Sequence, residues 1–232
     1  MTKEQYRRIE DYMLACMGES AHDREHVCRV LYLALDIAET ESAADRDVLI
    51  AAALLHDVGR PEQTADQSLD HALVGADKAE SFLRSLGYGE DFVSHVGACI
   101  RSHRFRRARP PESIEAKILF DADKLDVCGA TGIARTLQYG GSLGCPLYHR
   151  DEAGFISDGC EGHDGIRDAA GISFFQEYHY KLEKLYDRFL TPRGEELARQ
   201  RKEAARAFYE ALLSEVRSPE ETGRALLEGL LG

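Results

Sequence analysis

A run of eight apolar residues that ends in a histidine and an aspartate constrains this chain more than any other feature. Residues 48–55, Val-Leu-Ile-Ala-Ala-Ala-Leu-Leu, predict a buried helix, and His56 and Asp57 follow directly. Burying an imidazole beside a carboxylate costs free energy unless a partner replaces the lost hydration. A divalent metal is the natural partner, because imidazole nitrogen and carboxylate oxygen bind Mn, Fe, Co, Ni and Zn. The junction therefore predicts a metal site at the end of a core helix.

Two further candidate ligands lie on separate predicted helices. In residues 21–39 the apolar positions recur at helical spacing, and His26 lies at the edge of that apolar face, where it can point inward. Asp123 lies within a predicted helix over residues 112–138. A single buried histidine is usually a hydrogen-bonded core residue, and a single helical aspartate is usually exposed, so neither position indicates a metal by itself.

The order histidine, His-Asp, aspartate resembles the ligand order of the HD superfamily of metal-dependent phosphohydrolases. The Val-Gly-Arg-Pro segment after the His-Asp pair is similar to that family, and residues 114–135 resemble a subgroup of small bacterial HD proteins. Some members of that subgroup are nucleoside triphosphate pyrophosphohydrolases. Residues 173–185 are similar to its C-terminal helices, so the resemblance covers about residues 20–215. It implies a divalent ion (Mn, Fe, Co, Ni, Mg or Zn) bound by four residues: His26, His56, Asp57 and Asp123.

Two more histidines bear on the number of ions. His71 and His103 stand where dinuclear HD proteins carry histidines, and Asp57 has two oxygens with which it could bridge two ions. The alternatives are that His71 lies on a polar first turn and that His103 only donates a hydrogen bond to a ligand. The subgroup often lacks a histidine at the position of His71. The resemblance therefore favours one ion and allows two.

The resemblance implies hydrolysis of a phosphate ester or phosphoanhydride, since a divalent ion polarises a phosphoryl oxygen and lowers the pKa of its bound water. Nearby cations would stabilise the charge of the transition state. We expect Lys124 to be catalytic, and Asp126 or Asp121 to accept a proton or to hold a neighbouring side chain. The expected substrate-binding residues are all basic: Arg29, Arg60, Arg104, Lys181 and Lys184. Each cation could instead be a solvated surface residue, and the general base stays open.

The amino-acid composition limits the classes of binding partner and the cellular compartment that we expect. The formal net charge of −12 disfavours a polymeric nucleic acid and an anionic membrane as partners, but not a small phosphorylated substrate held by local cations and a metal. The sequence contains no run of about 18 apolar residues, which is the length that a membrane-spanning helix needs. The six cysteines show no CxxC spacing, which suits a reducing compartment. We expect a cytoplasmic protein, and a homo-oligomer is allowed.

The apolar spacing is helical almost throughout and predicts an all-α class, namely an HD-domain helical bundle with additional C-terminal helices. We expect one domain over residues 1–232, with the motif core at about 22–130 and helices within 172–230. A long glycine-rich loop over 140–171 separates these parts and is expected to be a lid. Within it, spacing alone also allows a zinc site made of Cys145, His149, Cys160 and His163. Pro219 predicts a break between helices at 193–217 and 219–230.

The leading functional prediction is a divalent-metal-dependent phosphohydrolase that acts on a small phosphorylated metabolite, most plausibly a nucleotide. Pyrophosphate release from a nucleoside triphosphate is the best single reaction, and a nucleotidase is the next. Two alternatives belong to other classes. One is a dinuclear iron oxygenase of the HD type, which His71 and His103 would allow, and the other is a catalytically silent metal-binding regulatory module.

Overall fold

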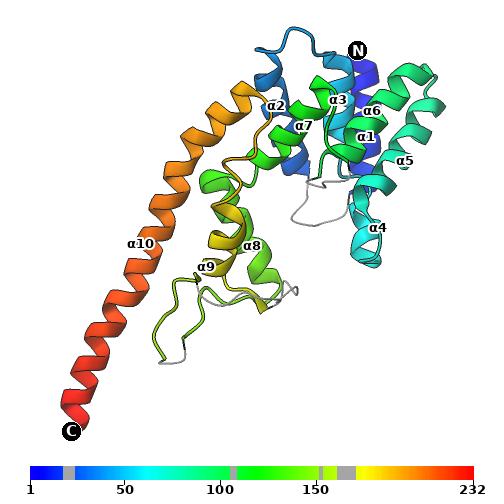
Figure 1. Ribbon diagram of the computed structural model, residues 1–232. Helices are drawn as coiled ribbons and strands as arrows, with labels where there is room; N and C mark the ends of the chain where they lie inside the picture. Colours follow the sequence, from blue (N-terminus) through cyan, green and yellow to red (C-terminus); the bar gives the residue numbers. More distant parts are fainter. Residues whose placement is uncertain (18–23, 105–108, 152–153, 161–170) are drawn as a thin grey trace. The chain divides into compact units, whose positions relative to one another are not determined.

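The computed structural model describes residues 1–17, 24–104, 109–151, 154–160 and 171–232, which are mostly helical (Figure 1). The predicted all-α class is confirmed, since the described part of the chain has no strand, only a single antiparallel bridge between Arg150 and Ile156. The elements, in chain order, are α1 (Lys3–Cys16), α2 (Arg24–Ala38), α3 (Arg46–Leu55), α4 (Arg60–Ala65), α5 (His71–Ser85), α6 (Glu90–Ser102), α7 (Ile114–Leu125), α8 (Gly129–Ser142), α9 (Phe174–Glu177), the π-helix η2 (Tyr178–Leu182) and α10 (Pro192–Leu231). None of these helices combines the length and the hydropathy that a membrane span requires.

The chain divides into two compact units. The first contains Met1–Asp126 and Phe189–Glu196, and the second contains Val127–Arg188 and Leu197–Gly232. Helix α10 starts in the first unit and continues in the second. Every candidate metal ligand predicted by the resemblance belongs to the first unit. The organisation as one domain over residues 1–232 stays a prediction.

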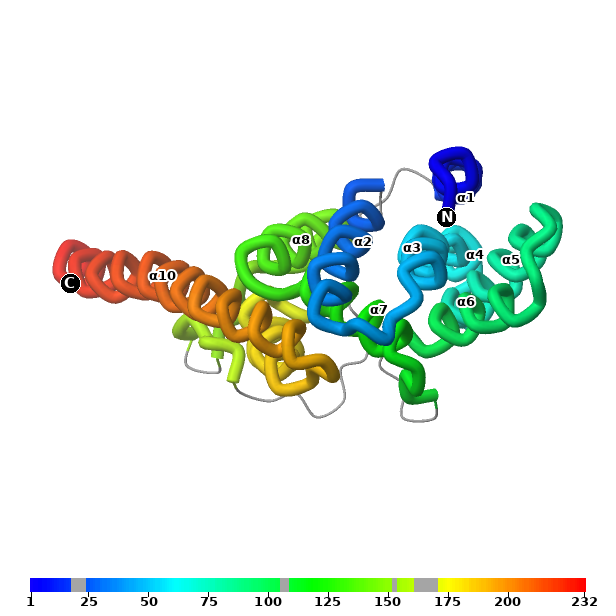
Figure 2. The backbone as a smooth tube through the Cα atoms, turned by 90° about the horizontal axis from the view of Figure 1, so that it is seen from above, coloured from blue at the N-terminus to red at the C-terminus, as the bar shows by residue number. Residues whose placement is uncertain are grey.

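Helix α3 is the centre of the first unit. It packs against α1, α2, α5, α6 and α7, and Figures 1 and 2 show it between α2 and α6. All of its apolar residues are buried except Ile50, which is half-buried, as expected for a helix without an extended polar face. Asp45 caps its start by accepting hydrogen bonds from the backbone N–H groups of Asp47 and Val48. His56 and Asp57, which follow the last residue of α3, are therefore buried in the interior of the first unit.

The second unit is held by aromatic contacts among α9, η2 and α10. The rings of Tyr178 and Tyr209 stack with centroids 4.2 Å apart, and Phe175 meets Tyr209 edge-on at 5.4 Å. Gly159, at φ +89°, lies so close to this helical segment that a Cβ there would be 2.5 Å from the carbonyl carbon of Phe175. Glycine is therefore required at that contact.

Several predicted helix boundaries are wrong. The helix expected over 112–138 is two helices, because Gly129 has φ +68°, which no continuous α-helix accommodates. The break expected at Pro219 does not occur, and α10 runs through it. Pro219 is exposed, so the backbone carbonyl that loses its hydrogen bond there can bind water. The short α4 was not predicted.

Of the alternative zinc ligands, His163 lies outside the described residues, and His149 donates from Nε2 to the carbonyl of Gly171.

The start of α10 is anchored to the first unit by a buried aspartate. The Asp121 carboxylate, with no exposed surface, accepts hydrogen bonds from the backbone N–H groups of Leu190 and Thr191 and from the Thr191 hydroxyl, at 2.7–2.9 Å. The Thr191 hydroxyl in turn accepts from the N–H of Gly194 and so caps the helix. Asp121, one of the two proton acceptors considered from the sequence, therefore holds the helix start in place.

Asp121→Ala should lower the free energy of unfolding by about 3 kcal/mol, because it leaves several buried donors without an acceptor. Urea denaturation followed by circular dichroism measures this loss. The exposed Asp187→Ala serves as the matched control and should change stability by less than about 0.5 kcal/mol. Equal stability of the two variants would contradict the anchoring role.

Candidate metal centre

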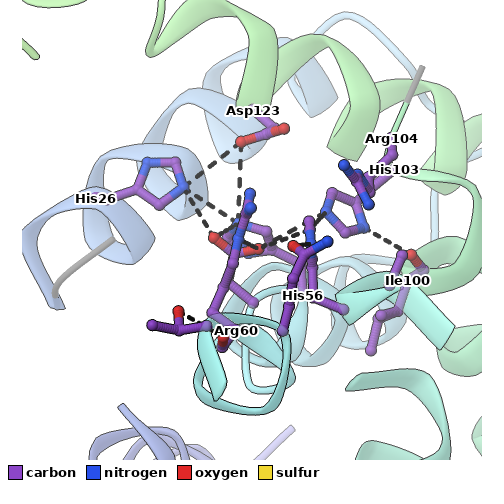
Figure 3. Close-up of polar contacts among 12 residues, drawn as sticks. His26, His56, Arg60, Ile100, His103, Arg104 and Asp123 are labelled. Carbon is purple, nitrogen blue, oxygen red and sulfur yellow. Dashed lines mark hydrogen bonds and ion pairs between the residues drawn. The ribbon is translucent and has the colours of Figure 1, made fainter. Parts of the chain in front are cut away.

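Six side chains from five places along the chain converge inside the first unit, and Figure 3 shows four of them by label. They are His26 on α2, His56 and Asp57 directly after α3, His71 at the start of α5, His103 directly after α6, and Asp123 on α7. Five of them are buried, with exposed side-chain fractions of 0–1%, whereas 25% of Asp123 is exposed. The centre is therefore enclosed and opens to solvent near Asp123.

The first group of three consists of His26, His56 and Asp123, whose ligand atoms all lie within 4.8 Å of one another. The Nε2 atoms of His26 and His56 are 3.3 Å apart. Asp123 Oδ1 lies 3.5 Å from His26 Nε2 and 4.0 Å from His56 Nε2 (Figure 3). These atoms surround a space that could hold a metal ion.

The second group consists of Asp57, His71 and His103, within the same 4.8 Å limit. The Nε2 atoms of the two histidines are 3.3 Å apart, and they lie 3.4 and 3.8 Å from Asp57 Oδ1. The other oxygen of Asp57, Oδ2, lies 3.5 Å from His26 Nε2 and 3.7 Å from His56 Nε2. One carboxylate thus faces both groups with a different oxygen toward each. No third such group occurs in the described ranges.

Hydrogen bonds at the far ring nitrogen orient all four histidines. His56 Nδ1 lies 2.8 Å from the carbonyl of Ala53, and His103 Nδ1 lies 2.6 Å from the carbonyl of Ile100. His26 Nδ1 lies 2.7 Å from Asp126 Oδ2, and His71 Nδ1 lies 2.6 Å from Gln63 Oε1. Each partner is an oxygen that accepts, so each Nδ1 carries a proton and donates it. A neutral ring must then present an Nε2 lone pair to the centre.

This arrangement fits a bound cation. In the second group both rings are neutral, because burial lowers the pKa of His71 to about 2 and also lowers that of His103. Two buried lone pairs that face each other at 3.3 Å repel unless a positive charge lies between them. Imidazole nitrogens backed by a hydrogen-bonded oxygen, together with carboxylates, are the donor set of divalent transition metals.

The first group differs in protonation. Burial alone would lower the pKa of His26, but hydrogen bonds to Asp126 and Asp57 and the charge of Asp123 raise it to about 9. Burial lowers the pKa of His56 to about 4. Without metal at neutral pH, His26 is therefore protonated on Nε2 and His56 is neutral. An ion bound by the first group takes the place of that proton.

A close backbone contact brings the second group next to the first. After α3 the chain turns at Gly59, where a Cβ would lie 2.4 Å from the carbonyl oxygen of His71 and 2.6 Å from the N of Gly75. No other residue fits at Gly59 without moving the backbone. Glycine at position 59 is therefore needed for the close backbone contact that places His71, on α5, near Asp57.

The predicted catalytic residues lie on or beside α7. Asp126 binds His26 and also accepts from Arg29 Nε at 2.6 Å, so it holds a histidine in place, as one of the sequence interpretations stated. Lys124 is buried, with its Nζ 2.7 Å from the centroid of the Phe120 ring. Its predicted contact with a phosphate stays a prediction.

The predicted substrate-binding cations lie in different settings. Arg60 donates from Nε to Asp57 Oδ1 at 2.9 Å, and among the described residues no acceptor contacts its Nη1 or Nη2. Arg29 pairs with Asp126, and Arg104 donates to Asp70 at 3.0 Å. The two lysines belong to the second unit: Lys181 pairs with Glu177, and Lys184 lies 5.5 Å from the Tyr180 ring. Arg60 is thus the cation bound directly at the centre.

Comparison with known proteins identifies the family. The HD domain family model matches residues 24–128. The chain is 32% identical to YpgQ of Bacillus subtilis over 187 residues, which cover 78% of each protein. The chain belongs to the HD superfamily. The predicted resemblance to the HD superfamily is confirmed, and the four expected ligands, His26, His56, Asp57 and Asp123, lie within the matched residues 24–128.

Solved structures agree with this HD-superfamily assignment. The crystal structure of B. subtilis YpgQ in complex with ADP has a TM-score of 0.69 at 28% identity, and the match covers 91% of this chain and 98% of that one. An HD-superfamily hydrolase from Bacillus thuringiensis also has a TM-score of 0.69 at 28% identity, over 92% and 97% of the two chains. The HD protein is therefore an enzyme, a metal-dependent phosphohydrolase.

Metal binding at pH 7 should release about one proton per chain, because His26 must lose its Nε2 proton to the buffer. A proton with a pKa of about 9 competes with the metal, so the affinity for Mn²⁺ should rise with pH up to about pH 9. Titration calorimetry in buffers of different ionisation enthalpy counts the protons. Asp126→Asn, which removes the carboxylate behind His26, should release fewer. Binding by the wild type without proton release would contradict this assignment.

Proposed function

We propose that this HD protein hydrolyses a nucleotide at a site that holds two divalent ions bridged by Asp57. The observation that carries the proposal is the convergence of four histidine Nε2 atoms and two carboxylates in two groups, with one oxygen of Asp57 facing each group. In this proposal His26, His56 and Asp123 hold one ion, and His71 and His103 hold the other. The proposal thus departs from the single ion that the resemblance favoured, because the fold brings His71 and His103 to the second oxygen of Asp57.

The bound ions would polarise a phosphoryl oxygen and lower the pKa of a coordinated water, so that hydroxide is available near neutral pH. Side chains of the protein would supply the other contributions to the reaction. Arg60 donates to Asp57 from Nε, its Nη groups are available for a phosphate oxygen, and 26% of its side chain is exposed. A guanidinium there can stabilise the charge that develops on the equatorial oxygens. Asp126 keeps His26 in its binding orientation.

Three observations support a nucleotide as substrate. The segments at 114–135 and 173–185 resemble the subgroup that includes nucleoside triphosphate pyrophosphohydrolases. YpgQ, which is similar over most of its length, has been crystallised with ADP. The centre is enclosed except near Asp123, which suits a small phosphorylated molecule better than a polymer. Release of pyrophosphate from a nucleoside triphosphate is the reaction we favour, and a nucleotidase reaction is the next.

A screen of nucleoside triphosphates and monophosphates with Mn²⁺, Co²⁺, Ni²⁺ and Mg²⁺ tests this proposal. Phosphate and pyrophosphate are measured separately, and we expect pyrophosphate from at least one triphosphate. His56→Ala should lower turnover by at least about a hundredfold and lower the bound metal, because the neighbouring ligands are already engaged. His149→Ala, in the second unit, is the matched control and should retain turnover and metal.

One outcome would favour the oxygenase alternative. The pairing of His71 with His103 at a second ion position is also what a dinuclear iron oxygenase requires. Two bound irons and oxygen consumption with an organic substrate, together with no hydrolysis of any phosphorylated compound under any of the four metals, would overturn the proposal. Metal binding without either reaction would favour the silent regulatory module.

A further inference from the structure

We infer that Gln63 is a positioning residue that makes the second ion position available by fixing the proton of His71 on Nδ1. The inference rests on the proposed two-ion centre and concerns what controls the occupancy of its second half. It assigns a role to a residue on the short helix α4, which the sequence patterns did not indicate.

The orientation of the Gln63 amide is determined by its own contacts. Its Nε2 donates to the carbonyl of Leu69 at 2.9 Å, so its Oε1 is the atom that faces His71 Nδ1 at 2.6 Å. An amide oxygen accepts and cannot donate. His71 must therefore place its proton on Nδ1 and present the Nε2 lone pair to Asp57 and His103.

Without this acceptor, His71 has a competing arrangement. A proton moved to His71 Nε2 would point at the lone pair of His103 Nε2, which is 3.3 Å away. The two histidines would then form a hydrogen bond with each other, and neither lone pair would be available to an ion. His103 cannot resolve the conflict by changing its own tautomer, because its Nδ1 is bonded to the carbonyl of Ile100. The Gln63 amide is thus what keeps the second group open.

Metal binding by the second group also depends more on correctly oriented histidine rings than metal binding by the first group does. In the first group Asp123 is a carboxylate ligand, and the negatively charged Asp126 backs His26. In the second group the carboxylate oxygen of Asp57 is shared with the Arg60 guanidinium at 2.9 Å, and both histidines are backed by neutral oxygens. Less negative charge faces the second ion, so the loss of one oriented imidazole has a larger effect there.

The backbone holds Gln63 at the required distance. Gly59 directly precedes α4, and its contact with His71 and Gly75 leaves no space for a Cβ. Lys78 on α5 donates hydrogen bonds from Nζ to the carbonyl of Val58, at 2.7 Å, and to Glu62 Oε1, at 2.6 Å. These bonds join α5 to the beginning of α4. These contacts, all made by residues just before Gln63, keep the beginning of α4 against α5.

The test counts Mn²⁺ ions per chain by equilibrium dialysis and records the spin coupling of a Mn²⁺ pair by electron paramagnetic resonance. We expect two coupled ions in the wild type. In Gln63→Ala we expect one tightly bound, uncoupled ion and a second-site affinity roughly 10- to 100-fold lower. Gln63→Glu, whose carboxylate also accepts from Nδ1, should restore the coupled pair. Thr64→Ala, on the same short helix, is the matched control and should bind like the wild type.

The possible outcomes distinguish a failure of the role of Gln63 from a failure of the two-ion proposal. A coupled pair of wild-type affinity in Gln63→Ala would overturn the role of Gln63 and leave the two-ion proposal intact. A wild type that binds a single ion, with His71→Ala binding equally well, would overturn both. Failure of Gln63→Glu to restore the pair, with the variant folded by circular dichroism, would also count against the inference.

Discussion

Four hydrogen bonds, each from a histidine Nδ1 to an oxygen, determine what this protein can bind. They turn the Nε2 atoms of His26, His56, His71 and His103 toward one buried space. Two of the acceptors are backbone carbonyls at helix ends, three residues before the histidine. A histidine just after a helix can bond that carbonyl with little loss of side-chain entropy, so α3 and α6 each orient a ring by ending where they do. The other two acceptors are side chains, Asp126 and Gln63.

The shared carboxylate makes two groups into one centre. Asp57 is almost fully buried, and its two oxygens face different pairs of histidines. A buried carboxylate needs positive charge nearby, and in this fold Arg60 supplies part of it from the solvent side. In the proposed reaction the same guanidinium would also bind an oxygen of the anionic substrate. Charge compensation in the resting protein and recognition of a phosphate can therefore use one residue.

Much of the first unit could be predicted from the sequence. The apolar spacing located α2 and α3, and the His-Asp pair at the end of an all-apolar helix indicated the metal centre. The joint role of His71 and His103 could not be read from spacing, because it depends on the backbone contact at Gly59 that brings α5 to Asp57. Gln63 was missed because α4 has six residues, too few for a periodic pattern, although Gly59-Arg60-Pro61 is a plausible helix start. The uninterrupted helix through Pro219 shows that a proline need not end a helix where it is exposed to solvent.

The most direct test of the two-ion centre is a crystal structure with Mn²⁺, with anomalous scattering recorded on both sides of the manganese edge. The account predicts two anomalous peaks, about 3.5–4 Å apart, with one oxygen of Asp57 bound to each. The first peak should contact His26, His56 and Asp123, and the second should contact His71 and His103. A single peak, with His71 and His103 hydrogen-bonded to each other and contacting no ion, would contradict it.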